Sequence, residues 1–80
     1  MEEKKKGTRH DWTDIHSKTG YSPRFRQIVS VIISIHKTEK NVYSITPYSA
    51  SGERLGNSEC SETEAGCYPI MEKAFVARDR

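Results

Sequence analysis

The segment VSVIISIHKTEKNVYSITPY, Val29 to Tyr48, decides the fold. Both of its apolar runs alternate with a period of two and are rich in β-branched residues, which favours strands over helices. The polar residues 37–41 between the runs suit a hairpin loop, in which Asn41 can take a left-handed conformation. We therefore predict two antiparallel strands, over residues 25–36 and 42–48, joined by a short loop.

Alternation gives each predicted strand two different faces. Because successive side chains point to opposite sides of a strand, one face of the first strand collects most of its large apolar residues. The opposite face places Ile28 and Ile32 among polar residues, and in the second strand Tyr43 shares a face with Ile45. We expect the core to lie under the apolar face of the first strand, which carries Phe25, Val29, Val31, Ile33 and Ile35.

The segment SETEAGCYPIMEKAF, residues 61–75, predicts a helix. Ser61 is a favourable N-cap, and Glu64 three residues later completes a capping box. Pro69 is the awkward residue, because proline inside a helix removes a hydrogen bond. The helix either kinks at Pro69 or begins there, with a turn before it. Residues 55–60, between the sheet and the helix, predict at most a short edge strand.

Eighty residues suffice for a single domain with a small core. Residues 1–20 contain few large apolar side chains and the run Lys4–Lys6, so we predict a mobile basic arm, with a short helical turn over residues 10–18. Residues 21–80 form the domain. The predicted class is α+β: a small antiparallel sheet of two or three strands packed against one C-terminal helix, with a flexible N-terminal arm.

Several classes of protein are disfavoured by the same sequence. No apolar segment approaches the length of a membrane span, and the N-terminus lacks the apolar run of a secretory signal, so we expect a cytoplasmic protein. Six residues separate Cys60 and Cys67, which is too many for a zinc knuckle, and a cytoplasmic disulfide is not expected. We find no phosphate-binding loop and no activated nucleophile. We expect no metal site, no cofactor and no enzymatic activity.

The charge pattern suggests nucleic acid as a ligand. The formal net charge is +2, and residues 1–40 hold nine Lys and Arg against five Asp and Glu. Cations at the tips of a hairpin can contact a phosphate backbone, and a two-stranded ribbon fits a major groove. The favoured hypothesis is a non-enzymatic accessory or regulatory module that binds nucleic acid through the basic arm and through Arg24, Arg26, Lys37, Lys40 and Arg54.

The order of elements that the sequence predicts after residue 42 also suggests nucleic acid as a ligand. The line YSITPYSASGERLGNSECSETEA, residues 43–65, has an aromatic strand, a glycine turn, a further strand and the acidic start of a helix. This order resembles the small three-stranded DNA-binding domains found in some integrases and in plant AP2-type factors, and the resemblance covers residues 41–76. It implies a sheet that contacts DNA. The chain departs from that pattern because it lacks the density of Arg and Trp with which such sheets read DNA.

The alternative hypothesis is a protein-binding inhibitor or adaptor, of the kind that phages and mobile elements encode. The mixed second face of the first strand supports it, because isoleucines left in water forgo ~1.5–3 kcal/mol each. The same face would also allow a homodimer built sheet to sheet. On this hypothesis the interface contains Trp12, Ile28, Ile32 and Tyr43.

Overall fold

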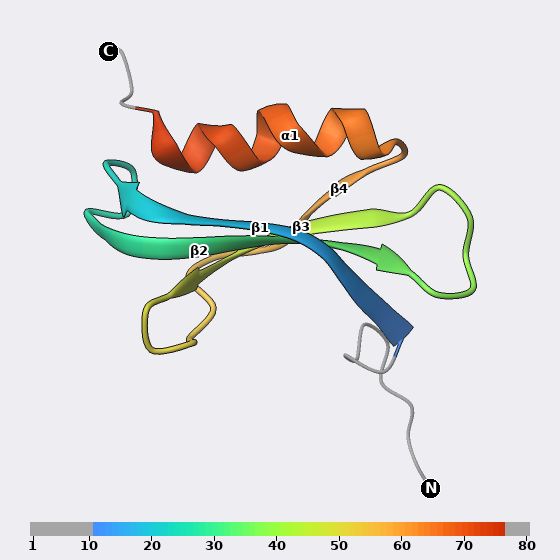
Figure 1. The fold of residues 1–80 in the computed structure, drawn as a ribbon, viewed down its shortest axis with the longest axis horizontal. Helices are drawn as coiled ribbons and strands as arrows, with labels where there is room; N and C mark the ends of the chain where they lie inside the picture. The colour runs from blue at the N-terminus through green and yellow to red at the C-terminus, as the bar shows by residue number, and fades with distance from the viewer. Residues whose placement is uncertain (1–10, 77–80) are drawn as a thin grey trace, which may run out of the picture.

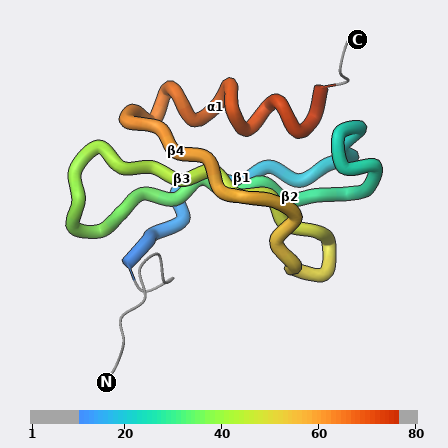
Figure 2. Tube along the Cα trace, turned by 180° about the vertical axis from the view of Figure 1, so that it is seen from behind, coloured from blue at the N-terminus to red at the C-terminus, as the bar shows by residue number. Residues whose placement is uncertain are grey.

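The computed structural model describes residues 11–76 and shows an α+β fold with one antiparallel sheet and a C-terminal helix. The strands follow one another across the sheet in the order β1-β2-β3-β4 (Figure 1). The helix crosses one face of the sheet, and neither view of the chain places another element over the opposite face (Figure 2). The elements are β1 (Trp12–Ser22), β2 (Gln27–His36), β3 (Tyr43–Ser49), β4 (Glu59–Ser61), α1 (Glu64–Glu72) and the 3₁₀ turn η2 (Lys73–Phe75).

Strand β1 is the main difference from the sequence-based prediction. The helical turn expected over residues 10–18 was wrong, because β1 pairs along the whole of β2, from Trp12 opposite His36 to Ser22 opposite Gln27. Residues 12–20 of the predicted arm therefore belong to the sheet, and residues 1–10 lie outside the described residues. The pairing depends on backbone hydrogen bonds, and most β1 side chains are exposed, so the strand carries little apolar alternation that would reveal it.

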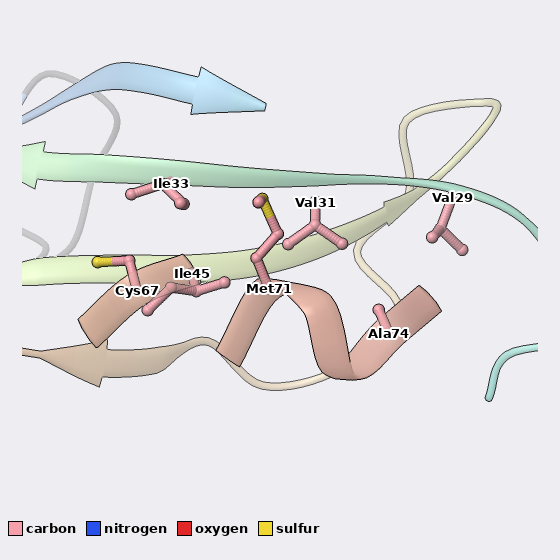
Figure 3. Close-up of a cluster of buried hydrophobic side chains, with 7 residues drawn as sticks. All are labelled: Val29, Val31, Ile33, Ile45, Cys67, Met71 and Ala74. Carbon is pink, nitrogen blue, oxygen red and sulfur yellow. The ribbon is translucent and has the colours of Figure 1, made fainter. Parts of the chain in front are cut away.

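The core lies between β2 and α1, on the predicted face of the sheet. Val29, Val31 and Ile33 of β2 are buried and point toward the helix, and Ile45 of β3 lies beside them (Figure 3). The helical side contributes Cys67, Met71 and Ala74. The predicted core position is confirmed for Val29, Val31 and Ile33, whereas Phe25 packs against the core from the turn before β2 and Ile35 is only half-buried.

The start of α1 differs from the predicted capping box. Thr63 is the N-cap, with an extended backbone (φ −135°, ψ 152°), and its Oγ1 accepts a hydrogen bond from the N–H of Gly66 at 3.0 Å. Ser61 is instead the last residue of β4, and its Oγ accepts from the N–H of Thr63 at 3.2 Å. The cap lies two residues later because the chain stays extended through Thr63. α1 runs through Pro69, so a helix that begins at Pro69 was also wrong.

The segments that follow β2 and β3 agree with the sequence-based prediction more closely than the N-terminal segment does. Asn41, in the β2–β3 loop, has a φ of 58°, so the predicted left-handed conformation is confirmed. The expected third strand is present but shorter and later than residues 55–60: β4 pairs with β3 from Tyr43 opposite Ser61 to Ile45 opposite Glu59. Within residues 11–76 the sheet has four strands rather than the two or three expected, because β1 was missed.

Side chains of β1 tie this edge strand to the helix. The ring of His16 meets the ring of Tyr68 edge-on at 5.3 Å between centroids. The Nζ of Lys18 lies 2.8 Å from a carboxylate oxygen of Glu72 and 4.9 Å from the centroid of the Phe75 ring. These contacts hold β1 against the C-terminal elements, although only its inner edge pairs with the described sheet.

The two cysteines occupy different environments, which predicts different reactivity. Cys60 is exposed, whereas Cys67 is buried in the core, and burial raises the pKa of the Cys67 thiol. Because the thiolate is the reactive form, we expect a thiol-specific reagent at neutral pH to label one cysteine quickly and the second only in denaturant. Peptide mass analysis should place the fast label on Cys60. Equal labelling rates in the native protein would contradict this assignment.

Candidate functional site: the open face of the sheet

The sheet face opposite α1 carries its own set of side chains, which we call the open face. Strand pairing places Asp14 opposite Ser34, and Ser34 opposite Ser44, so these residues form one row across three strands. A parallel row contains Ile32 and Thr46. By this register the open face consists of Trp12, Asp14, Ser17, Thr19 and Tyr21 of β1, Ile28, Ser30, Ile32, Ser34 and His36 of β2, Ser44, Thr46 and Tyr48 of β3, and Cys60 of β4.

The open face is hollowed. A recess of about 320 Å³, which we call the hollow, has Ile32 and Thr46 in its lining, with Trp12 on the β1 side and Arg54 on the β3–β4 side. The pairing of β1 with β2 is irregular between Asp14 and His16. The N-terminal end of β1 bends away from α1. The bent end of β1 and the β3–β4 connection both extend to the side away from α1 (Figures 1 and 2). The two edges thus form the walls of the hollow.

Hydroxyl groups line the hollow and are hydrogen-bonded to one another or to a carboxylate. The Oγ of Ser34 donates to Asp14 at 2.7 Å, and the hydroxyl of Thr46 bonds that of Ser58. Both Ser34 and Thr46 are buried, so these bonds satisfy groups that would be costly to leave unpaired. The hollow therefore combines a polar floor, in which the hydroxyls are already held, with apolar side chains.

One end of the open face is organised around His36. Its Nδ1 accepts hydrogen bonds from the backbone N–H of Thr38 at 3.2 Å and of Glu39 at 3.1 Å, which ties the ring to the β2–β3 loop. The ring of Trp12 meets the His36 ring edge-on at 4.8 Å between centroids. Both backbone donors point at Nδ1, and the ring, held in this way, meets Trp12 at the margin of the hollow.

Three of the four residues of the predicted protein interface lie on one face of the sheet. Trp12, Ile28 and Ile32 share the open face, whereas Tyr43 lies on the helix side, where it packs against the core. Tyr43 does not share the open face with the other three, because its pairing with Ile35 gives it the orientation of the core residues. Sequence reasoning missed Tyr21, which is 59% exposed and lies opposite Ile28, itself 47% exposed.

The five predicted nucleic-acid contacts do not form one patch. Arg54 lines the hollow, whereas Arg24 lines a smaller recess on the helix side, together with Ile70 and Ala74. Arg26 lies in the β1–β2 turn, and Lys37 and Lys40 follow the opposite end of β2. Residues 11–76 hold seven Lys and Arg against eight Asp and Glu, so the described part of the chain is close to neutral.

Residues 11–76 contain neither a metal-binding cluster nor a membrane-spanning helix. Between residues 11 and 76, no three His, Cys, Asp or Glu side chains lie close enough to share a metal ion. No helix within this range is long and apolar enough to cross a membrane. No protein-family model matches the chain, and neither a curated protein nor a solved structure matches it.

Proposed function

We propose that this protein is a small non-enzymatic binding module, an inhibitor or adaptor, that engages a protein partner through the open face. One observation carries the proposal: β1 and β2 bring Trp12, Ile28 and Ile32 onto a single sheet face that no described element covers. The near-neutral charge of the described residues favours a protein over nucleic acid, because binding to phosphate depends on an excess of cations.

Exposed apolar area on this face provides the driving force. Ile28 and Tyr21 are neighbours across β2 and β1, and each is about half exposed in the free chain. Burying one such side chain is worth up to ~1.5–3 kcal/mol. Trp and Tyr are also the residue types that most often dominate the energy of protein interfaces. The open face offers both types around a hollow.

The shape of the face argues for a convex partner. Two copies joined face to face would enclose two hollows of about 320 Å³ each. At ~30 Å³ per molecule that space would trap on the order of twenty waters. A protruding segment fills the hollow better than a second concave face. Since Arg54 lies at its margin, we infer a partner that presents an apolar side chain with an aspartate or glutamate beside it.

Site-specific photocrosslinking tests this function. A photoreactive phenylalanine is placed at Ile28 on the open face or, as a matched control, at the exposed Ala65 of α1, in the full chain expressed in living cells. We expect a defined protein adduct from position 28 and none from position 65. Adding Trp12→Ala should reduce the adduct by about 30-fold, since losing an interface tryptophan costs ~2 kcal/mol.

The pattern of adducts separates the alternatives. Equal adducts from positions 28 and 65, or an adduct that Trp12→Ala leaves unchanged, would overturn the proposal. An adduct removed by nuclease would identify nucleic acid as the ligand of this face. An adduct with a second copy of the chain would identify the homodimer that the sequence also allows.

Nucleic acid is the second candidate, and one observation favours it: Arg54 lies in the same hollow as Tyr48 and Trp12. Aromatic rings and arginine together are the usual platform for single strands. In this case a labelled single-stranded oligonucleotide should bind at low salt, and the double variant Lys37→Ala and Lys40→Ala should weaken the binding. Absence of binding at low salt would exclude this candidate.

A further inference from the structure

Strand β1 has an outer edge with which no residue of the described part of the chain pairs. It is the first strand of the sheet order and pairs only with β2. β1 contains 11 residues, whereas β4, at the opposite edge, contains three. A long edge strand presents a row of N–H and C=O groups to which another strand can add.

The usual means of blocking such an edge are weak in residues 16–22 of β1. Proteins protect edge strands with proline, with a bulge, with charge or with a covering element. The irregularity of β1 lies before residue 16, and the segment HSKTGYS contains no proline. Its only lysine is Lys18, whose ammonium group lies 2.8 Å from the carboxylate of Glu72, on the helix side. The charge that would repel a second strand is thus held on the helix side by Glu72.

The helix also leaves this edge accessible. α1 packs mainly over β2, β3 and β4 and meets β1 through the His16–Tyr68 and Lys18–Glu72 side-chain pairs, while η2 places the Phe75 ring near Gly20. Any strand added to β1 would therefore lie beside the helical layer and not beneath it. It would extend the open face on one side of the sheet.

We infer that β1 pairs antiparallel with β1 of a second copy of this chain, about a two-fold axis at Thr19. In this register Thr19 faces Thr19 of the second copy, Ser17 faces Tyr21, and Lys18 faces Gly20. Pairs of threonines across strands are favourable, and the glycine opposite Lys18 carries no charge. The register places no two like charges opposite each other, and the two contacts that flank the axis are identical, as a two-fold interface requires.

Other registers are worse. A two-fold axis at Lys18 would set two ammonium groups opposite each other, which is destabilising. An axis at Ser17 would oppose Lys18 to His16. An axis at Gly20 would bring Pro23 opposite Ser17, and proline has no N–H to donate. The axis at Thr19 alone keeps the whole of residues 16–22 in the ladder.

The dimer joins two sheets into one of eight strands, with both helices on the same side. It goes beyond the function proposed above, because it uses the edge of the sheet and leaves both open faces available. A ladder of seven residues is small beside the ~1,600 Å² of a standard interface, so the dimer should be weak. We expect it to form between roughly micromolar and millimolar concentrations.

Sedimentation equilibrium of the full chain tests the dimer. The average mass of the native protein should rise toward twice the monomer mass as the concentration increases. Thr19→Lys sets two lysines against each other at the axis, and this variant should remain monomeric. Ala65→Lys adds the same charge on the exposed side of α1 and should dimerise like the native chain. A native chain that stays monomeric at millimolar concentration would overturn the inference.

A disulfide test checks the register and does not depend on the lysine variant. Facing residues of an antiparallel pair have Cα atoms ~4.5–5.5 Å apart, within the range of a disulfide. In a chain with Cys60→Ser, Thr19→Cys should form a covalent dimer under mild oxidation. Ser17→Cys should not, because its copies would lie about four residues apart along the ladder, roughly 13 Å. Crosslinking by both variants at equal rates, or by Ser17→Cys alone, would refute this pairing, whatever the crosslinking test of the open face shows.

Discussion

Replacing Ile33 by alanine is expected to leave the protein barely folded. Ile33 is fully buried at the centre of the core, between Val31 of the same strand and Ile45 of the next. Removing three methyl or methylene carbons from such a site costs ~2–5 kcal/mol, because the cavity does not fully collapse. A domain of this size has a total unfolding free energy of roughly 4–12 kcal/mol. Urea denaturation followed by circular dichroism measures the loss.

Ile28→Ala provides the matched control. It makes the same chemical change in the same strand, but on the open face, where the side chain is 47% exposed. We expect its unfolding free energy to stay within about 1 kcal/mol of the native value, since much of its surface is already in water. Equal losses in the two variants would mean that the faces of β2 have been assigned incorrectly.

Replacing Pro69 by alanine is expected to stabilise the protein by about 2 kcal/mol. Pro69 lies inside α1, beyond the first turn, where an N–H would donate to the carbonyl of Ala65. Proline in a helix interior costs ~3 kcal/mol relative to alanine. Part of the gain is offset, since the unfolded chain without proline is less restricted by ~0.4–1 kcal/mol. Because Pro69 is exposed, the substitution leaves the core unchanged.

Pro23→Ala shows whether this gain comes from the helix. Pro23 lies in the β1–β2 turn, where a fixed φ is an advantage. Its removal should lower the unfolding free energy by ~0.4–1 kcal/mol, the opposite sign to Pro69→Ala. Thermal unfolding of both variants gives the comparison. A lower midpoint for Pro69→Ala than for the native chain would show that α1 depends on its proline.

The sequence predicts those elements that bury one face. In β2, Val29, Val31 and Ile33 recur at every second position, and this pattern can be recognised because water is excluded from one side only. β1 lacks that pattern, since both of its faces are largely exposed. Its place in the sheet follows from backbone pairing with β2, which no local property of residues 12–22 specifies.

The candidate site likewise has one part that the sequence pattern predicts and another that depends on strand pairing. That Ile28 and Ile32 would share a face followed directly from their spacing in one strand. The spacing does not show that Trp12 lies on the same face, because this depends on the register of β1 against β2, which sets Trp12 opposite His36. Arg54 reaches the hollow through the path of the β3–β4 connection, which contains a single bridge between Tyr48 and Arg54. Long-range placement of this kind is decided by topology and leaves no periodic trace in the sequence.

The order of elements has a consequence for synthesis on the ribosome. All four strands precede α1 in the chain, yet α1 supplies the other half of the core. A nascent chain that ends before residue 63 would have its strands complete and Val29, Val31 and Ile33 without their cover. Such an intermediate, which exists for roughly seconds at normal elongation rates, is prone to aggregation. Premature termination within α1 should therefore yield insoluble product, whereas shortening the chain before Trp12 would remove no part of the described sheet.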